Sequence, residues 1–279
     1  MGLRINTNVP ALTAQRNLSN TRAALDSNLE RLSSGSRINS AGDDAAGLAI
    51  SESLRAQIRG INQAQRNAQD GISLVQVAEG AMAEVSNILI RMRELGVQAA
   101  SDTVGNQERQ FLNVEFQQLL EEVDRIANST KFNGVPLLNG KSSTFEVQIG
   151  TGNNPLIDRV TLFDPYKADI NSVALGINLA NVQDKASAQN SLSSIDRALS
   201  HVTSIRAEFG AMQNRLQSVI NNIMVTKENL AAANSRIRDA DIATETSELT
   251  KNQILMQAGV SVLSQANNAV QGALQLLQN

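Results

Sequence analysis

The sequence contains no cysteine and no tryptophan, and aromatic residues make up only 3% of its 279 positions. The absence of cysteine excludes disulfides and thiol chemistry. Hydrophobic residues nevertheless make up 42% of the chain, so the apolar material is aliphatic. This composition favours long helices packed through narrow seams over a thick globular core. The length is sufficient for one or two domains.

Charges of both signs are mixed along the chain, and no basic block is present. There are 24 lysines and arginines against 27 acidic residues, which gives a formal net charge of −3. Nucleic acid and anionic lipid are therefore not expected as partners. The N-terminal segment lacks the basic and apolar regions of a secretory signal, and no stretch reaches the ~18 apolar residues of a membrane span. We expect no membrane insertion, and any export must use a route that does not read a cleaved signal.

Residues suited to catalysis are scarce. His201 is the single histidine, so neither a histidine metal site nor a Ser/His dyad can be built around a second imidazole. We expect His201 to be a solvated surface residue. The segment GVPLLNGKSS resembles a phosphate loop, but Val135 stands where its first glycine is required, so a turn is the better interpretation. No catalytic, cofactor-binding or metal-binding residue is predicted.

Aliphatic residues recur every seven positions near both ends of the chain, which is typical of coiled-coil helices. The N-terminal row contains Leu18, Leu25 and Leu32, and the C-terminal row contains Ile242, Leu249, Met256, Leu263, Val270 and Leu277. The positions three residues further on are weakly apolar; they include Asn28, Asn252 and Gly259. We predict that these two segments order when they meet each other and neighbouring chains, with these rows as the assembly seam. An ordinary helix pair within one chain is the alternative.

The central part of the chain predicts three more long helices and one β-hairpin. A separate seven-residue row runs from Ile195 to Ile237 and then slips, and the glycine-rich segment SSGSRINSAGDDAAG interrupts the N-terminal helix in the same way. Alternation of apolar residues predicts a hairpin near 143–163. The predicted fold is mainly α, with long antiparallel helical hairpins and coiled coils and the small β region far from the termini. We predict an inner domain of 1–42 with 240–279 and an outer domain of 43–239.

Two long motifs resemble bacterial flagellins. They are LSSGSRINSAGDDAAGLAISESLRAQIRGINQAQRNAQDGISLVQVAEGAM and QILMQAGVSVLSQANNAVQGALQLLQ, and the likeness covers essentially the whole chain. It implies a structural subunit, not an enzyme, that polymerises into the flagellar filament for motility. The chain is a short form without the variable outer domains of longer flagellins. A flagellar hook–filament junction protein is the alternative, and a free coiled-coil adaptor is a third possibility.

The resemblance also implies partners and a location. The partners are other copies of the chain in a helical homopolymer, an export chaperone at the C-terminal segment, and the filament cap and hook–filament junction proteins. The location is secreted, in the flagellar filament outside the cell or within a sheath or periplasm. The segments ILIRMRELGVQ and LNVEFQQLL resemble the surface recognised by the vertebrate innate immune receptor for flagellin, which implies contacts by Arg91, Leu95 and Glu115. Filament packing is the alternative, and primary, role of these residues.

Overall fold

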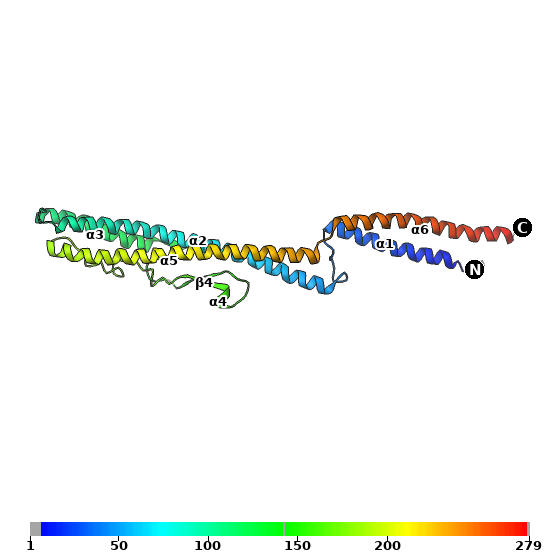
Figure 1. Ribbon diagram of the computed structural model, residues 1–279, viewed down its shortest axis with the longest axis horizontal. Helices are drawn as coiled ribbons and strands as arrows, with labels where there is room; N and C mark the ends of the chain where they lie inside the picture. The colour runs from blue at the N-terminus through cyan, green and yellow to red at the C-terminus, as the bar shows by residue number, and fades with distance from the viewer. Residues whose placement is uncertain (1–6, 142, 278–279) are drawn as a thin grey trace. The chain divides into compact units, whose positions relative to one another are not determined.

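The computed structural model describes residues 7–141 and 143–277, which form two compact units. Unit 1 contains the described residues up to Ala56 and those from Asn229 onwards, and unit 2 contains Gln57–Glu228. Both units are built mainly from long helices (Figure 1). The predicted mainly α fold class is confirmed.

Unit 1 is built around an antiparallel pair of helices, α1 (Val9–Ser34) and α6 (Ile242–Leu277), which lie side by side in Figure 1. The Asn8 side chain accepts a hydrogen bond from the Ala11 N–H at the start of α1, and Gly35 ends the helix with a φ of 68°. A residue without a side chain adopts that left-handed conformation at little cost. The pair is therefore bounded by a side-chain cap at one end of α1 and a glycine at the other.

The two interruptions predicted from the sequence meet each other in unit 1. Helix α2 (Ala45–Ala100) begins after the glycine-rich interruption, and helix α5 (Lys185–Arg238) ends just before the second one. The Arg37 N–H donates to the Arg238 carbonyl at 2.6 Å, and the Ala240 N–H donates to the Gly35 carbonyl at 3.0 Å. These bonds join the two connecting segments as a short antiparallel bridge.

Unit 2 packs the remainder of α2 against α3 (Asn106–Ser129) and α5. The seven-residue row of α5 lies on its buried face, with Ile195, Val202 and Leu216 fully buried. At the turn between α2 and α3, the buried Arg109 side chain donates to the carbonyls of Ala99 and Ser101, each at 2.8 Å. A cation bound to the last carbonyls of a helix stabilises its C-terminus.

The segment between α3 and α5 holds two small antiparallel sheets and a short helix. Strands β3 (Phe145–Gln148) and β4 (Arg159–Phe163) pair across α4 (Pro155–Asp158), which confirms the predicted hairpin. Strands β1 (Lys131–Phe132) and β2 (Val135–Pro136) form a second hairpin, where the sequence predicted only a turn. Asn133 and Gly134 between them both have positive φ, and such residues form the tight turns that join antiparallel strands.

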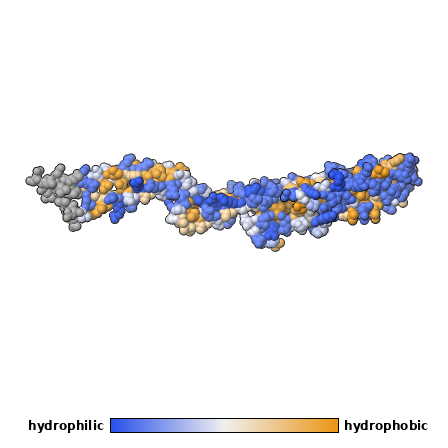
Figure 2. Space-filling view, turned by 180° about the vertical axis from the view of Figure 1, so that it is seen from behind, coloured by the Kyte–Doolittle hydropathy of each residue, from blue (hydrophilic) through white to orange (hydrophobic). Residues whose placement is uncertain are grey.

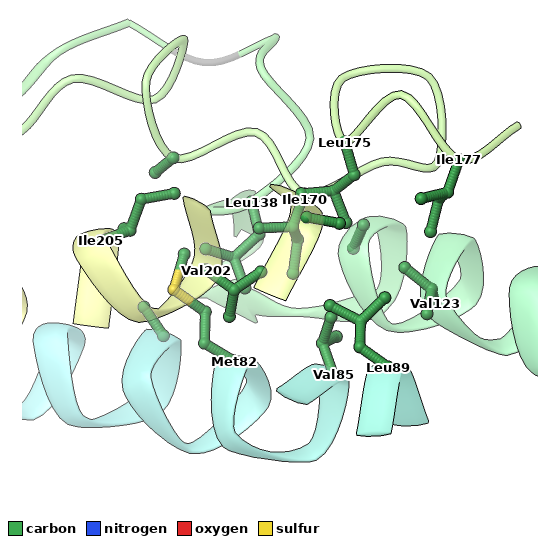
Figure 3. Packing of buried hydrophobic residues seen from close by; sticks show 14 of the residues in the cluster. Met82, Val85, Leu89, Val123, Leu138, Ile170, Leu175, Ile177, Val202 and Ile205 are labelled. Carbon is green, nitrogen blue, oxygen red and sulfur yellow. The ribbon is translucent and has the colours of Figure 1, made fainter. Parts of the chain in front are cut away.

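The core of unit 2 lies where the three helices meet this segment (Figure 3). The side chains that converge there are Met82, Val85 and Leu89 from α2, Val123 from α3, Val202 and Ile205 from α5, and Leu138, Ile170, Leu175 and Ile177 from the segment. All of them are aliphatic, as the composition predicted. A tilted stack of Phe145, Phe163 and Phe209 joins the β3–β4 hairpin to α5, with ring centroids 5.2 and 5.1 Å apart.

Candidate functional site on the terminal helices

The two predicted rows face each other along the contact between α1 and α6. The described members of both rows are half-buried, except that Ile242 is 53% exposed. A Cβ atom added to Gly259 would stand 3.2 Å from Leu18 Cδ1, so the two helices approach closely there. The Asn8 side chain donates to the Ala266 carbonyl at 3.0 Å near the open end of the pair. The side chains of Val270 and Leu277 lie outside the described residues.

A second apolar row on α6 was missed by the sequence analysis. It consists of Ile254, Leu255, Ala258 and Val262, which we call the outer row, and it is exposed, with Ile254 at 61% and Val262 at 54%. Residues four apart on a helix share a face, and the spacing of Ile254, Ala258 and Val262 could have revealed the row. Figure 2 shows apolar surface over the terminal helices. Exposed apolar rows of this kind mark interaction surfaces.

The most buried side chains between α1 and α6 are largely polar. Within the described part of these two helices, only Ala14, Asn28, Glu245 and Asn252 are buried. The Asn28 side-chain amide donates to a Glu245 carboxylate oxygen at 2.6 Å, and the Asn252 amide donates to the Asn28 oxygen at 2.8 Å. The pair therefore combines half-buried aliphatic side chains with a hydrogen-bonded polar cluster near the connecting segments.

Carboxylates hold the connecting segments in place. The pKa of Asp43 lies below its ordinary value because the Ser40 and Asn39 backbone N–H groups donate to it. The pKa of Asp241 is lowered because the Thr244 and Ala243 N–H groups at the start of α6 donate to it. The pKa of Glu52 is lowered chiefly by its hydrogen bond from the Arg238 guanidinium. Asp241 thus caps the start of α6, Asp43 closes the turn before α2, and Glu52 ties α2 to the end of α5.

The three residues assigned to the immune receptor by resemblance lie in different environments of unit 2. The Arg91 guanidinium pairs with Glu115 at 2.9 Å and with Glu94 at 2.9 Å. Both carboxylates raise the pKa of Arg91, and the hydrogen bond to Glu94 has the larger effect. The Arg91 and Glu115 side chains are 50% and 45% exposed. Leu95 is only 1% exposed and packs in the core. Arg91 and Glu115 thus form one exposed ion-pair cluster, whereas Leu95 can act only indirectly, by packing α2 against the core of unit 2.

The described residues offer no arrangement for metal chemistry. Within them, no group of three or more His, Cys, Asp or Glu residues could hold a metal ion. His201 is exposed on α5, as the sequence analysis expected. In the described part of the chain, no helix is long and apolar enough to cross a membrane.

Comparison with known proteins identifies the family. Residues 5–143 match the model of the bacterial flagellin N-terminal helical region, and residues 192–277 match that of the C-terminal helical region. The chain belongs to the bacterial flagellin family. It is 48% identical to a flagellin of Halalkalibacterium halodurans, over 98% of this chain and 99% of that protein. It is 43% identical to the flagellar filament 33 kDa core protein of Treponema phagedenis, over 98% and 99% of the two chains.

A solved structure agrees with this assignment. The crystal structure of Bacillus cereus flagellin matches with a TM-score of 0.50 at 34% identity, over 61% of this chain and 94% of that chain. As a member of this family, the chain described here is a structural subunit of the flagellar filament, which serves motility, and it is not an enzyme. The hook–filament junction alternative has less support, because both relatives named above, which match over almost the whole chain, are filament proteins by their names.

Proposed function

We propose that in the filament the outer row of α6 packs against a terminal helix of a neighbouring subunit. The observation that carries this proposal is that α6 has two apolar faces and α1 covers only one of them. The rows that include Leu18 and Leu263 lie in the contact within the chain, whereas Ile254 and Val262 remain more than half exposed. Complete burial of an aliphatic side chain contributes about 1.5–3 kcal/mol, so this row offers several kcal/mol to a neighbouring helix.

The same observation supports an inner domain of 1–42 with 240–279 that becomes fully ordered on assembly. The leucines between α1 and α6 are only half-buried, and the buried positions are mostly polar. Ordering a residue costs about 1–2 kcal/mol of backbone entropy, and a single half-covered seam offsets little of it. Contacts from neighbouring subunits supply the missing burial. In this proposal residues 43–239 form the outer domain.

Two charge substitutions on α6 test the assembly role of the outer row. Val262→Asp places a carboxylate in the outer row, and Gln257→Asp places the same charge at an exposed polar position on the same helix. Burial of an unpaired carboxylate against a neighbour costs several kcal/mol and is repeated in every subunit. We expect Val262→Asp protein to stop elongating filament seeds, with Gln257→Asp protein elongating them normally. Equal elongation of both variants, seen by electron microscopy, would remove the outer row from the interface.

The proposed partners and location follow from the family. We propose that the chain is secreted, that an export chaperone holds the C-terminal segment before export, and that the cap and hook–filament junction proteins contact its terminal helices. The exposed outer row supports the chaperone proposal, because a helix with an uncovered apolar face fits an apolar groove. Co-purification of a coexpressed flagellar export chaperone with the full chain, and its loss with Val262→Asp, tests this.

The vertebrate innate immune receptor for flagellin is a further proposed partner. Exposure of the Arg91–Glu115 ion pair on unit 2 supports a contact there. Since Leu95 is buried, its proposed part is to hold α2 in position beneath Arg91. Activation of the receptor by Arg91→Ala protein, measured in a reporter assay, tests this surface.

A further inference from the structure

A chain of buried hydrogen bonds joins α1 to α6 near the end of the pair where the connecting segments meet. Asn252 donates to Asn28, Asn28 donates to Glu245, and the Arg31 guanidinium pairs with the second Glu245 oxygen at 3.4 Å. Asn28, Glu245 and Asn252 are 7%, 9% and 8% exposed. We call these three residues and Arg31 the polar lock. Three buried polar side chains in a seam of this length weaken it relative to leucines, so their presence calls for another explanation.

The leucine rows by themselves do not determine how the helices align. Because both rows repeat every seven residues, sliding one helix by seven residues places an aliphatic side chain opposite an aliphatic side chain again. The polar lock does not repeat. Seven residues before Asn28 and Arg31 stand Thr21 and Ala24, and seven residues after them stand Gly35 and Ile38, beyond the end of α1.

A shifted alignment would therefore separate Glu245 from both of its partners. An acceptor that is buried without its donor destabilises the pair by the full free energy of its desolvation. This penalty is larger for a carboxylate than for a neutral group. Parallel, in-register pairing of two α6 helices has the same defect. It would bring together two copies of Glu245, with neither Asn28 nor Arg31 to receive them, and like charges in a seam repel.

We infer that the polar lock determines which helix α6 pairs with and in which alignment. It directs α6 to α1, in the alignment that places Leu18 beside Gly259, and it disfavours parallel pairing of α6 with a second α6. The backbone bonds of Gly35 and Ala240 hold the near end of the pair within one chain. These backbone bonds do not determine which helices pair when many identical terminal helices from different chains meet. In that case the side chains of the polar lock must distinguish α1 from α6 and the observed alignment from a shifted one.

Engineered cysteines can report the alignment, because the natural chain has none. Leu18→Cys with Gly259→Cys reports the observed alignment, since Leu18 Cδ1 lies 3.2 Å from a Cβ at position 259. Leu18→Cys with Ala266→Cys reports an alignment shifted by seven residues. Leu263→Cys alone can form a disulfide only between chains, and so it reports pairing of two α6 helices.

These reporters are compared in two matched backgrounds of the full chain. The first replaces the lock, with Asn28→Leu, Glu245→Leu and Asn252→Leu. The control makes the same changes at exposed positions, with Asn20→Leu, Glu30→Leu and Asn267→Leu. Disulfide yields are read on the unpolymerised chain when circular dichroism shows the terminal helices to be formed, and otherwise on polymer grown from filament seeds.

The preference for the observed disulfide over the shifted one should fall about tenfold or more in the lock variant, and the Leu263→Cys dimer should increase. The control should keep the preference of the natural sequence. If both backgrounds give the same yields, the inference is wrong. Should the lock variant lose helicity, Glu245→Gln provides the second measurement, because it keeps an oxygen for Asn28 and removes only the charge. A few-fold loss of preference is expected there, and an unchanged preference would again overturn the inference.

Discussion

Replacement of Leu263 by aspartate weakens the contact between α1 and α6 within the subunit, on which the proposed ordering during assembly depends. Leu263 is half-buried on α6, between Gly259, which meets Leu18, and Ala266, whose carbonyl accepts from Asn8. The substitution removes half of a leucine's burial, about 1 kcal/mol, and partly desolvates a carboxylate, so the total penalty is about 2–3 kcal/mol. The core of unit 2 consists of other residues and should be unaffected.

We therefore expect Leu263→Asp protein to be a folded, helical subunit that does not elongate filaments. Circular dichroism and thermal melting should show the transition of unit 2 at its normal temperature, and seeded polymerisation should give no filaments by electron microscopy. The penalty recurs in every subunit, so even 2–3 kcal/mol suffices to block growth. Normal filaments from this variant would refute the assembly role of the predicted seam, which includes Leu263.

Four further predictions follow from individual residues. Before assembly, the amides of Leu18 and Leu263 should exchange hydrogen quickly, and in the filament slowly; strong protection in the unpolymerised chain would contradict ordering on assembly. Arg91→Ala should weaken activation in a reporter assay for the immune receptor while helicity is kept, and unchanged activation would exclude its side chain from the contact. Gly80→Ala should raise the free energy of unfolding by about 1 kcal/mol in urea titrations, because Gly80 lies within α2 and no neighbouring atom stands within 4 Å of an added Cβ. Because the pKa of Asp241 is lowered in the folded chain, its capping contribution is complete above the ordinary value of 3.8 and is lost as the pH falls through the lowered pKa; melting temperatures between about pH 5 and pH 2 should therefore decline less in Asp241→Asn than in the natural chain.

Periodicity in the sequence was sufficient to predict most of the fold. The seven-residue rows located α1, α5 and α6, and the alternation around Val147 located the β3–β4 hairpin. The Asn-Gly turn between β1 and β2 was a recognisable hairpin signal, but its strands have only two residues each and carry no alternation of their own. Local sequence patterns thus predict long helices and strands more readily than short ones.

The candidate site was less predictable, because burial depends on contacts between distant segments. The row containing Leu263 and the outer row containing Val262 are both apolar, and the sequence does not indicate which of them α1 covers. The polar lock joins residues more than 200 positions apart, so Asn28 appeared only as a weak position in a leucine row. Burial of Leu95 depends in the same way on α3 and α5 closing over α2.

A density map of the assembled filament tests the central claim most directly, because it shows what covers the outer row of α6. The account predicts that Ile254, Ala258 and Val262 of each subunit are buried against a terminal helix of a neighbouring subunit, while α1 and α6 of one chain keep the contact between Leu18 and Gly259. A map in which the outer row faces solvent, with no neighbouring chain against it, would contradict the account.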